Sequence, residues 1–276
     1  MRFRHSIGRC LAAVVLVAVF ATGGCGSQVQ SPAPATEPPP RWPAFKADLS
    51  FVWSAEPGIN LLEGPGVVVR AYFESTMNAS SAGSNDYLYP GFDHAVPADE
   101  DAAEPGSINL WPELGFPTTA PWVGATRDHI LRITDRASII HAVTCHWTWG
   151  AAKLQPSGRY VNGPWEPDRN AGVTVMRFSL VPPENGTNAA LPPQEGPSKF
   201  PVDDVFGGWK VVGKLNDSTP PATLDRDWPE YHQDLEACIT KAPESAERRI
   251  FLTSGERPRS DYPTLPPSPG WPVENS

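Results

Sequence analysis

Residues Ile139 to Trp149 constrain the fold most strongly, because apolar side chains occupy both sides of this run. Successive side chains of an extended strand point to opposite faces. One face would carry Ile139, His141, Val143, Cys145, Trp147 and Trp149, and the other Ile140, Ala142, Thr144, His146 and Thr148. The pattern predicts a strand that is at least partly covered on both faces, as in the interior of a sheet.

Further strands are predicted on both sides of this segment. Val173 to Val181 alternates in the same way, and Trp209 to Leu215 follows the turn Gly207-Gly208. The links between these strands are loops without a crossover helix, which favours antiparallel pairing. Ordered structure is expected to begin at Ala47 to Trp53, and Arg249 to Thr253 is interpreted as one more strand.

Two helices are predicted to pack on this sheet. The first runs from about Pro65 to Asn78, since proline is well placed in a first helical turn, and Arg70 faces Glu74 four residues later. The second begins near Pro229, and one face of it carries Trp228, Tyr231, Leu235, Cys238 and Ile239. The expected class is α+β: an antiparallel sheet of several strands, packed by an N-terminal and a C-terminal helix and rich in loops.

Two segments lack a regular pattern. Ala79 to Ala125 is rich in Gly, Pro, Ser and acids, with an aromatic patch from Tyr87 to Phe92, and it is predicted either to hide a short helix or to wrap the domain as a functional loop. Pro258 to Ser276 is predicted to be a Pro-rich tail, which leaves 44–257 as a single globular domain.

The N-terminus has the organisation of a signal peptide, assigned to residues 1–24. Three arginines precede an apolar core from Leu11 to Ala21 that is too short to span a bilayer. Thr22-Gly23-Gly24 then leads to Cys25, an arrangement that resembles the lipobox of bacterial lipoproteins, although an apolar residue usually stands where this chain has Thr22. The resemblance implies that the thiol of Cys25 receives a diacylglyceryl group and that cleavage occurs just before it; acyl chains such as palmitate would then anchor the protein.

The anchor implies a location on the outer face of the cell membrane. Residues 25–43 are Ser/Pro-rich and are interpreted as a tether between lipid and domain. No later run of 18 apolar residues is present, so the lipid would be the only membrane attachment. Without residues 1–24 the chain carries 19 basic and 31 acidic side chains, a net charge of −12, which disfavours nucleic acid as a partner.

Cys145 and Cys238 are predicted to form a disulfide. Cys10 would leave with the signal peptide and Cys25 would carry lipid, so these two thiols remain in an oxidising envelope. Both lie on the apolar side of their predicted elements. The bridge would therefore join the central strand to the last helix.

Two weaker resemblances concern the fold and the source of the chain. A helix that opens the domain, followed by a sheet ending in Gly208-Trp209-Lys210-Val211-Val212, resembles the NTF2-like cone, a fold that often encloses a small apolar pocket. The segments FVWSAEPGINLLEGPGVVVRAYFES, DVFGGWKVV and PRSDYPTLPPSPGW resemble uncharacterised exported lipoproteins of mycobacteria and related actinobacteria. That second resemblance implies a location and brings no catalytic residues.

Catalytic and metal-binding signatures are absent from the sequence. It contains no Gly-x-Ser-x-Gly elbow, no His-Glu-x-x-His helix and no phosphate-binding glycine loop. His141, Cys145 and His146 are not expected to form a metal site, because strand geometry separates them, and both histidines are interpreted as packing residues. The acidic run 99–104 is interpreted as a solvated loop. We expect no metal and no cofactor.

The function expected from the sequence is binding without turnover. Aromatic side chains suit a small apolar or sugar-like ligand, and the proposed contacts are Tyr87, Tyr89, Phe92, Trp147 and Trp149. An envelope partner protein would fit the same surfaces. The alternative is an envelope hydrolase acting on glycan or peptidoglycan, for which a carboxylate beside a tryptophan, as at Asp227-Trp228 or Trp165-Glu166, would be needed. Catalysis is therefore left open.

Overall fold

A computed structural model describes residues 42–98, 104–136, 138–163, 165–184 and 191–273. The predicted signal peptide, Cys25 and nearly all of the tether lie outside these residues. The described residues belong to one unit that begins at Pro39.

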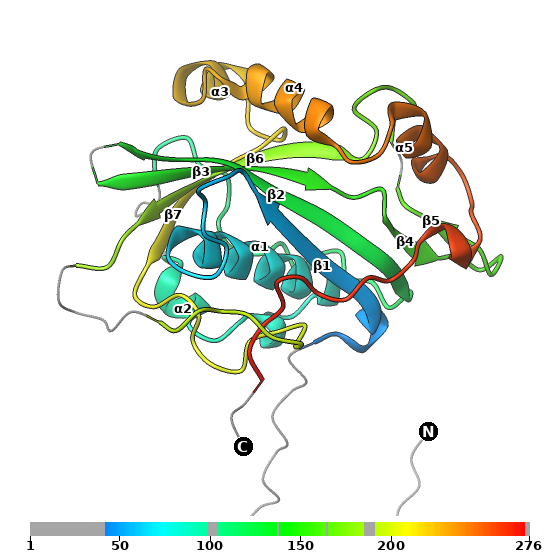
Figure 1. Cartoon of the computed structure of the whole chain (residues 1–276), viewed down its shortest axis with the longest axis horizontal. Helices are drawn as coiled ribbons and strands as arrows, with labels where there is room; N and C mark the ends of the chain where they lie inside the picture. The colour runs from blue at the N-terminus through cyan, green and yellow to red at the C-terminus, as the bar shows by residue number, and fades with distance from the viewer. Residues whose placement is uncertain (1–41, 99–103, 137, 164, 185–190, 274–276) are drawn as a thin grey trace, which may run out of the picture. The chain divides into compact units, whose positions relative to one another are not determined.

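A curled sheet of seven strands forms the centre of this unit (Figure 1). The strands are β1 (Asp48–Ala55), β2 (Trp122–Arg136), β3 (Ile139–Trp147), β4 (Ala151–Leu154), β5 (Tyr160–Val161), β6 (Val173–Val181) and β7 (Lys210–Leu215). Their order is β5-β4-β2-β3-β6-β7, with antiparallel pairing throughout, and β1 is added alongside β2. The α+β class with a largely antiparallel sheet is thereby confirmed.

The first strand departs from the predicted antiparallel pattern, since β1 pairs with β2 in parallel. Parallel neighbours need a long crossover connection. The chain between Ala55 and Trp122 supplies it and contains the helix α1 (Pro65–Ala82). Pro65 stands at the start of α1, and Gly83 ends it in a left-handed conformation with φ 67°.

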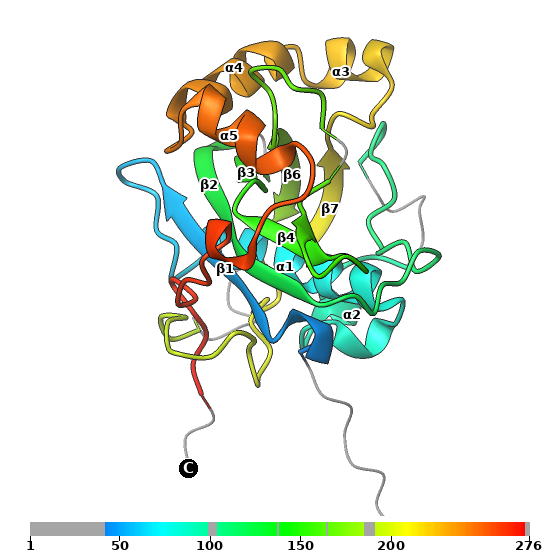
Figure 2. The ribbon, with the colours of Figure 1, turned by 90° about the vertical axis from the view of Figure 1, so that its right-hand side faces the viewer.

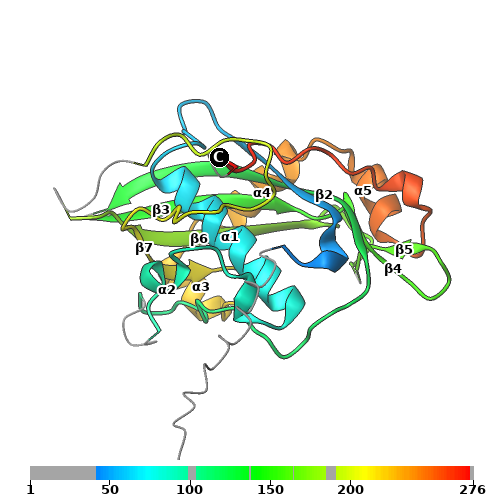
Figure 3. The same cartoon turned by 90° about the horizontal axis from the view of Figure 1, so that it is seen from below.

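Helices cover both faces of the sheet (Figures 1 and 2). α1 and the short α2 (Phe92–Ala95) lie on one face, together with the 3-10 turn η2 (Asn85–Tyr87). The opposite face carries α3 (Pro221–Asp227), α4 (Tyr231–Lys241) and α5 (Ala246–Thr253). Two further 3-10 turns are η1 (Ala44–Lys46) and η4 (Arg259–Asp261). Seen from below, α1 runs across the sheet (Figure 3).

Each face of the sheet has its own hydrophobic core. The α1 side contains Phe73, Ile130, Ala142, Phe178 and Leu180 among other residues. The α4 side contains Val143, Cys145, Trp147, Trp228 and Cys238 among others. Strands β3 and β6 supply alternate residues to the two cores, which is the two-sided burial that the sequence of β3 predicts.

Three segments differ from the sequence-based expectation. Arg249 to Thr253 is wrongly predicted as a strand, because it forms the second half of α5, whose first turn is capped by the hydroxyl of Ser245 accepting from the Arg248 N–H. The segment 79–125 contains α2 and the first residues of β2. The Pro-rich segment from Pro258 onward packs against the domain and buries Tyr262 and Trp271 in the two cores.

Arg70 and Glu74, which the sequence places one turn apart on α1, are both buried. The Arg70 guanidinium donates to four backbone carbonyls, those of Leu61, Gln194, Pro269 and Gly270. Arg70 thus ties two loops and the C-terminal segment to α1.

The Glu74 carboxylate lies beside Arg70 and accepts three hydrogen bonds, from Trp53 Nε1 at 2.7 Å, Tyr89 Oη at 2.9 Å and Trp271 Nε1 at 2.7 Å. Burial raises the pKa of Glu74 to about 7, against the opposing effects of Arg70 and the three donors. These donors come from β1, the loop after η2 and the C-terminal segment, so Glu74 connects distant parts of the chain.

Candidate functional site

The five aromatic residues expected to bind ligand do not meet at one site. Tyr89 and Phe92 belong to the core on the α1 side, whereas Trp147 and Trp149 belong to the core on the α4 side. Tyr87 is half-buried at the end of η2. Because four of the five rings close the two cores, we do not retain this group as a ligand site.

Cys145 and Cys238 are joined by a disulfide in the structure. The bridge connects β3 to α4, and Trp147 Nε1 donates to the Cys238 carbonyl at 3.1 Å. The bridge thus joins the sheet to the second predicted helix, as expected, although this helix is not the last one, since α5 follows it.

A cavity of about 590 Å³ lies between α1 and the strands β6 and β7, under the loop 108–116. We call it the large cavity. Apolar and aromatic side chains form most of its wall, namely Tyr72, Phe73, Met77, Ile108, Trp111, Phe116, Met176 and Phe178. Phe116 is 86% exposed and gives the cavity an apolar rim.

Lys214 is the cationic side chain in the wall of the large cavity. Its Nζ lies 5.9 Å from the centre of the Tyr72 ring, and within the described ranges it has no hydrogen bond or ion pair. Burial lowers the pKa of Lys214 to about 8, while Glu113 acts in the opposite direction. The cavity therefore combines an apolar wall with one ammonium group that has no bonded counter-ion among the residues that the structure describes.

A second cavity, of about 300 Å³, lies at the other side of Met77. We call it the small cavity. Its wall contains Trp122, Thr126, His146, Asn162 and Trp165. His146 is 5% exposed, and its Nδ1 is hydrogen-bonded to Oδ1 of the buried Asp128. His146 is thus a buried hydrogen-bonding group, and not only the packing residue that the sequence suggests.

Strand register explains how this pair forms. Asp128 on β2 lies opposite His146 on β3, and both side chains point to the α1 side. The ring of Phe73 covers the imidazole at a centroid distance of 4.5 Å. Burial raises the pKa of Asp128, and the neighbouring His146 acts against this shift.

A third group of polar side chains lies on the opposite face, at the edge of the sheet. Ser54 Oγ is 2.9 Å from His129 Nδ1, and His129 Nε2 is 3.0 Å from Glu56 Oε1. Ser54 and His129 are register partners in the parallel pair β1–β2. An open cavity of about 410 Å³ adjoins these three residues, but Lys241 also binds Glu56 Oε1 at 2.6 Å.

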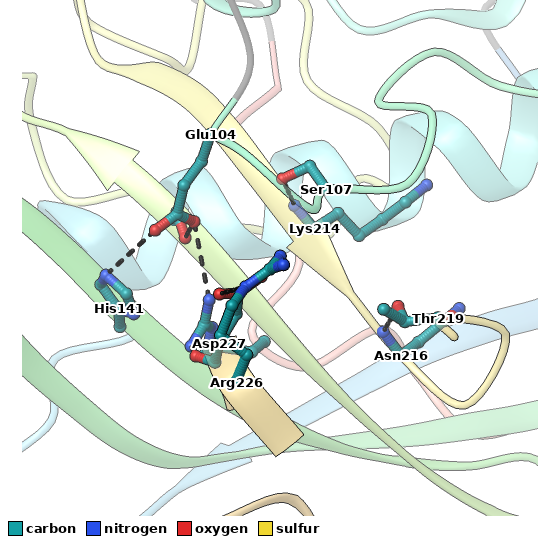
Figure 4. A network of polar contacts seen from close by, with 10 residues as sticks. Glu104, Ser107, His141, Lys214, Asn216, Thr219, Arg226 and Asp227 are labelled. Atoms are coloured by element: carbon teal, nitrogen blue, oxygen red, sulfur yellow. Dashed lines mark hydrogen bonds and ion pairs between the residues drawn. The ribbon is translucent and has the colours of Figure 1, made fainter. Parts of the chain in front are cut away.

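A polar network connects the edge of the sheet to α3 (Figure 4). Glu104 accepts from the Ser179 hydroxyl and lies 3.6 Å from Arg177 and 3.8 Å from His141. The backbone N–H of Glu104 donates to the Val212 carbonyl on β7. Glu104 is therefore a bound carboxylate, unlike the solvated acid that the sequence suggests; the rest of that acidic run lies outside the described residues.

The same network includes one of the carboxylates considered for glycan hydrolysis. Asp227 is held by Arg226 through two hydrogen bonds, of 2.7 and 2.6 Å, and its carbonyl accepts from Arg177. The neighbouring Trp228 is buried and donates to Asp234. Asp227 and Trp228 are thus engaged in structural contacts. We interpret the network as a set of contacts that hold α3 against the sheet, and not as a reaction site.

Metal binding finds no support in the described part of the chain. No three His, Cys, Asp or Glu side chains gather there in a way that would hold a metal ion. His141 lies near Glu104, whereas Cys145 is in the disulfide and His146 points to the other face. Nor does any helix in the described ranges have the length and apolarity to cross a membrane.

Sequence reasoning missed both the Lys214 cavity and the Asp128–His146 pair. The available signal for the pair was a polar residue on the inward face of each of two adjacent strands. For Lys214 the signal was a lysine at an inward position of β7, opposite Phe178 on β6. Neither signal identifies a cavity by itself, because α1 forms part of the wall of both cavities and the sequence does not show where α1 lies on the sheet.

No protein-family model matches this chain, and neither a curated protein nor a solved structure does.

Proposed function

We propose that this protein is an exported lipoprotein of the cell envelope, anchored through Cys25, and that its domain binds a small apolar ligand with an anionic end. The signal peptide and lipobox-like sequence support the location. The large cavity supports the ligand class, since about 590 Å³ falls within the range of roughly 300–1,000 Å³ typical of small-molecule sites. The ligand's apolar body would contact the aromatic wall, and its anion would pair with Lys214.

Lys214 is the observation that carries the proposal. An ammonium group that is partly removed from water and lacks a bonded counter-ion is unfavourable in the free protein. A carboxylate or similar anion would offset that cost by forming a charge-assisted hydrogen bond. An uncharged apolar ligand would not offset the free-energy cost of burying the Lys214 ammonium group.

The cavity also supports an NTF2-like architecture as the finer description of the fold. In such a cone, a helix packed against the concave side of a curled sheet encloses an apolar pocket. α1 and the sheet have that relationship here, with the large cavity between them. The parallel strand β1 and the three helices on the opposite face are features that this comparison leaves unaccounted for.

The test compares decanoate with decanol as probes of the soluble domain, by calorimetry and Trp fluorescence. We expect decanoate to bind more tightly, and its affinity to fall as the pH rises through about 8, because a deprotonated Lys214 must first take up a proton. Lys214→Met should abolish the preference for decanoate. Lys210→Met, at an exposed position of the same strand, is the matched control.

Two results would overturn this proposal. One is equal binding of decanoate and decanol to the wild-type domain. The other is a preference for decanoate that survives in Lys214→Met. Failure of both probes to bind at millimolar concentration would also exclude the large cavity as a site for such ligands.

Lipid attachment is tested separately in cells grown with a fatty-acid analogue. The wild-type protein should be labelled and should remain with membranes, whereas Cys25→Ser should be unlabelled. Equal labelling of the two forms would refute the anchor without affecting the ligand experiment.

An envelope hydrolase remains the second candidate, and the Ser54–His129–Glu56 chain favours it. A serine next to an imidazole that contacts a carboxylate is the arrangement that activates a hydroxyl for acyl transfer. It would act on ester or amide bonds, such as those in peptidoglycan peptides, and not on glycosidic bonds. The ion pair of Lys241 with Glu56 weakens this candidate, because it competes for the carboxylate.

A fluorophosphonate probe distinguishes the two candidates. Covalent labelling of Ser54, absent in Ser54→Ala and retained in Ser157→Ala, would establish a nucleophilic serine. An unlabelled protein would exclude this serine as a nucleophile and leave the binding function as the proposal.

A further inference from the structure

We propose that the small cavity is a second binding site and that it takes a sugar unit. This goes beyond the proposed function, because it names another ligand class at another place. The two cavities have only Met77 in common in their walls, so the sugar site does not depend on the ligand of the large cavity.

The first argument concerns polar atoms that have no partner. Two side chains in the wall of the small cavity carry a buried polar atom without a hydrogen bond: Trp122 Nε1, a donor, and Asn162 Oδ1, an acceptor. The two amide protons of Asn162 are already donated to the carbonyls of Thr148 and Ala151, at 2.7 and 2.6 Å. This side chain is therefore fixed, with its oxygen left over.

His146 adds a third polar atom. Its Nδ1 is taken by Asp128, which leaves Nε2 as the ring nitrogen available to a ligand. Within the described residues Nε2 has no hydrogen-bond partner. A buried donor and a buried acceptor thus lack a partner within the described residues and lie beside one cavity, whose wall also includes the His146 ring, although buried polar groups are normally paired.

The chemistry of these atoms selects hydroxyl groups. A hydroxyl both donates and accepts, so hydroxyls can satisfy an indole N–H, an amide oxygen and an imidazole nitrogen in either protonation state. A carboxylate would only accept and an ammonium would only donate. Several hydroxyls on one small framework are the defining property of a sugar.

The walls and the size of the cavity agree with this class. Trp165 presents a large flat ring with little entropy to lose, and the C–H face of a pyranose packs on such a ring, whereas the Trp122 ring already has Lys153 Nζ at 4.8 Å and Lys46 Nζ at 5.9 Å from its centre. A volume of about 300 Å³ lies at the lower end of the usual range for ligand sites and suits one ring more than a long chain. Ordered water is the competing occupant, because a polar cavity of this size holds water readily.

The experiment titrates monosaccharides into the soluble domain labelled with ¹⁵N-histidine. The probes are D-glucose, D-mannose, D-arabinose and N-acetyl-D-glucosamine, with cyclohexanol as a ring that has one hydroxyl. We expect at least one sugar to shift the Nε2 resonance of His146, assigned with His146→Gln, and cyclohexanol to bind at least about tenfold more weakly.

Trp122→Phe provides the sharpest variant, because it keeps an aromatic ring and removes the unpartnered N–H together with the smaller ring of the indole. It should still unfold cooperatively and should lose about tenfold in sugar affinity. Trp209→Phe, a half-buried indole outside the small cavity, should bind sugar as the wild type does. Decanoate binding should be unchanged in Trp122→Phe, which separates this site from the large cavity.

Several results would overturn the inference. One is an Nε2 resonance that stays fixed with every sugar, and another is cyclohexanol binding as tightly as the sugars. A crystal of the domain soaked in the four sugars that shows only ordered water on Trp122, His146 and Asn162 would do the same.

Discussion

Trp271 donates a hydrogen bond from its indole Nε1 to Oε2 of Glu74 at 2.7 Å, although the two residues are 197 positions apart in the chain. Arg70 contacts the same indole, since its guanidinium lies 4.3 Å from the centre of the Trp271 ring. The segment that contains Trp271 is therefore a structural part of the domain.

Trp271→Phe should lower the free energy of unfolding by about 1–3 kcal/mol, since it removes one donor from a buried carboxylate and replaces a buried indole with a smaller ring. Chemical denaturation of the domain measures this. Trp209→Phe is the comparison, because Trp209 is half-buried and its indole makes no such bond to a carboxylate. Equal stability of Trp271→Phe and wild type would show that the hydrogen bond contributes nothing.

Stability should fall between pH 4.5 and about 7 because of Glu74. Its pKa in the folded state is about 7, above the ordinary value of 4.5, so the folded protein holds a proton that the unfolded chain releases. The stabilisation is complete below pH 4.5 and is lost as the pH rises through about 7, by up to roughly 3 kcal/mol.

Glu74→Gln cannot titrate, so its stability should change less than that of the wild type over this pH range. Urea unfolding at a series of pH values gives both curves. Exposed Glu166→Gln is the control and should follow the wild type. Parallel curves for Glu74→Gln and wild type would contradict the raised pKa.

Gly213→Ala should destabilise the domain by about 1–3 kcal/mol. A Cβ at this position would lie 2.6 Å from Oε2 of Glu104 and 2.8 Å from the Ser179 Cβ, so the polar network at the sheet edge would have to move. Gly115→Ala, where no atom lies within 4 Å, should leave stability nearly unchanged. Thermal unfolding of the two variants tests this prediction. Similar melting temperatures would show that Glu104 and Ser179 can move to make room for the added methyl group.

The purified domain should contain no free thiol at Cys145 or Cys238. Alkylation under denaturing conditions followed by mass analysis should modify these residues only after reduction. Reduction should cost roughly 4–5 kcal/mol, because the bridge closes a long loop in the unfolded chain. Modification of both thiols without reductant would rule the bridge out.

The central strands of the sheet could be predicted from the sequence, because their alternate residues are buried on the two faces of the sheet. β6 has the predicted bounds, and β3 begins at the predicted residue. β2 was harder, since Arg127, Asp128 and His129 interrupt its apolar pattern; Asp128 and His129 each have a specific polar partner in the fold. The helix α5 was mistaken for a strand because Ile250, Phe251 and Leu252 form a short apolar run that fits either structure.

The candidate sites required the tertiary structure. Ser54, His129 and Glu56 meet through the parallel pairing of β1 with β2, which the sequence did not indicate. The wall of the small cavity combines α1, β2, β3 and the loop around Asn162. No local pattern brings residues 77, 122, 146 and 162 together, because their contact depends on register and on the crossing of α1 over the sheet.

The bonds to Glu74 also set an order of events during synthesis. Trp53, Glu74 and Tyr89 leave the ribosome early, but Trp271 follows almost two hundred residues later. Until then the carboxylate lacks one of its donors, and Arg70 lacks the carbonyls of Pro269 and Gly270. The contacts that complete the α1 core therefore form only after nearly the whole domain has been made.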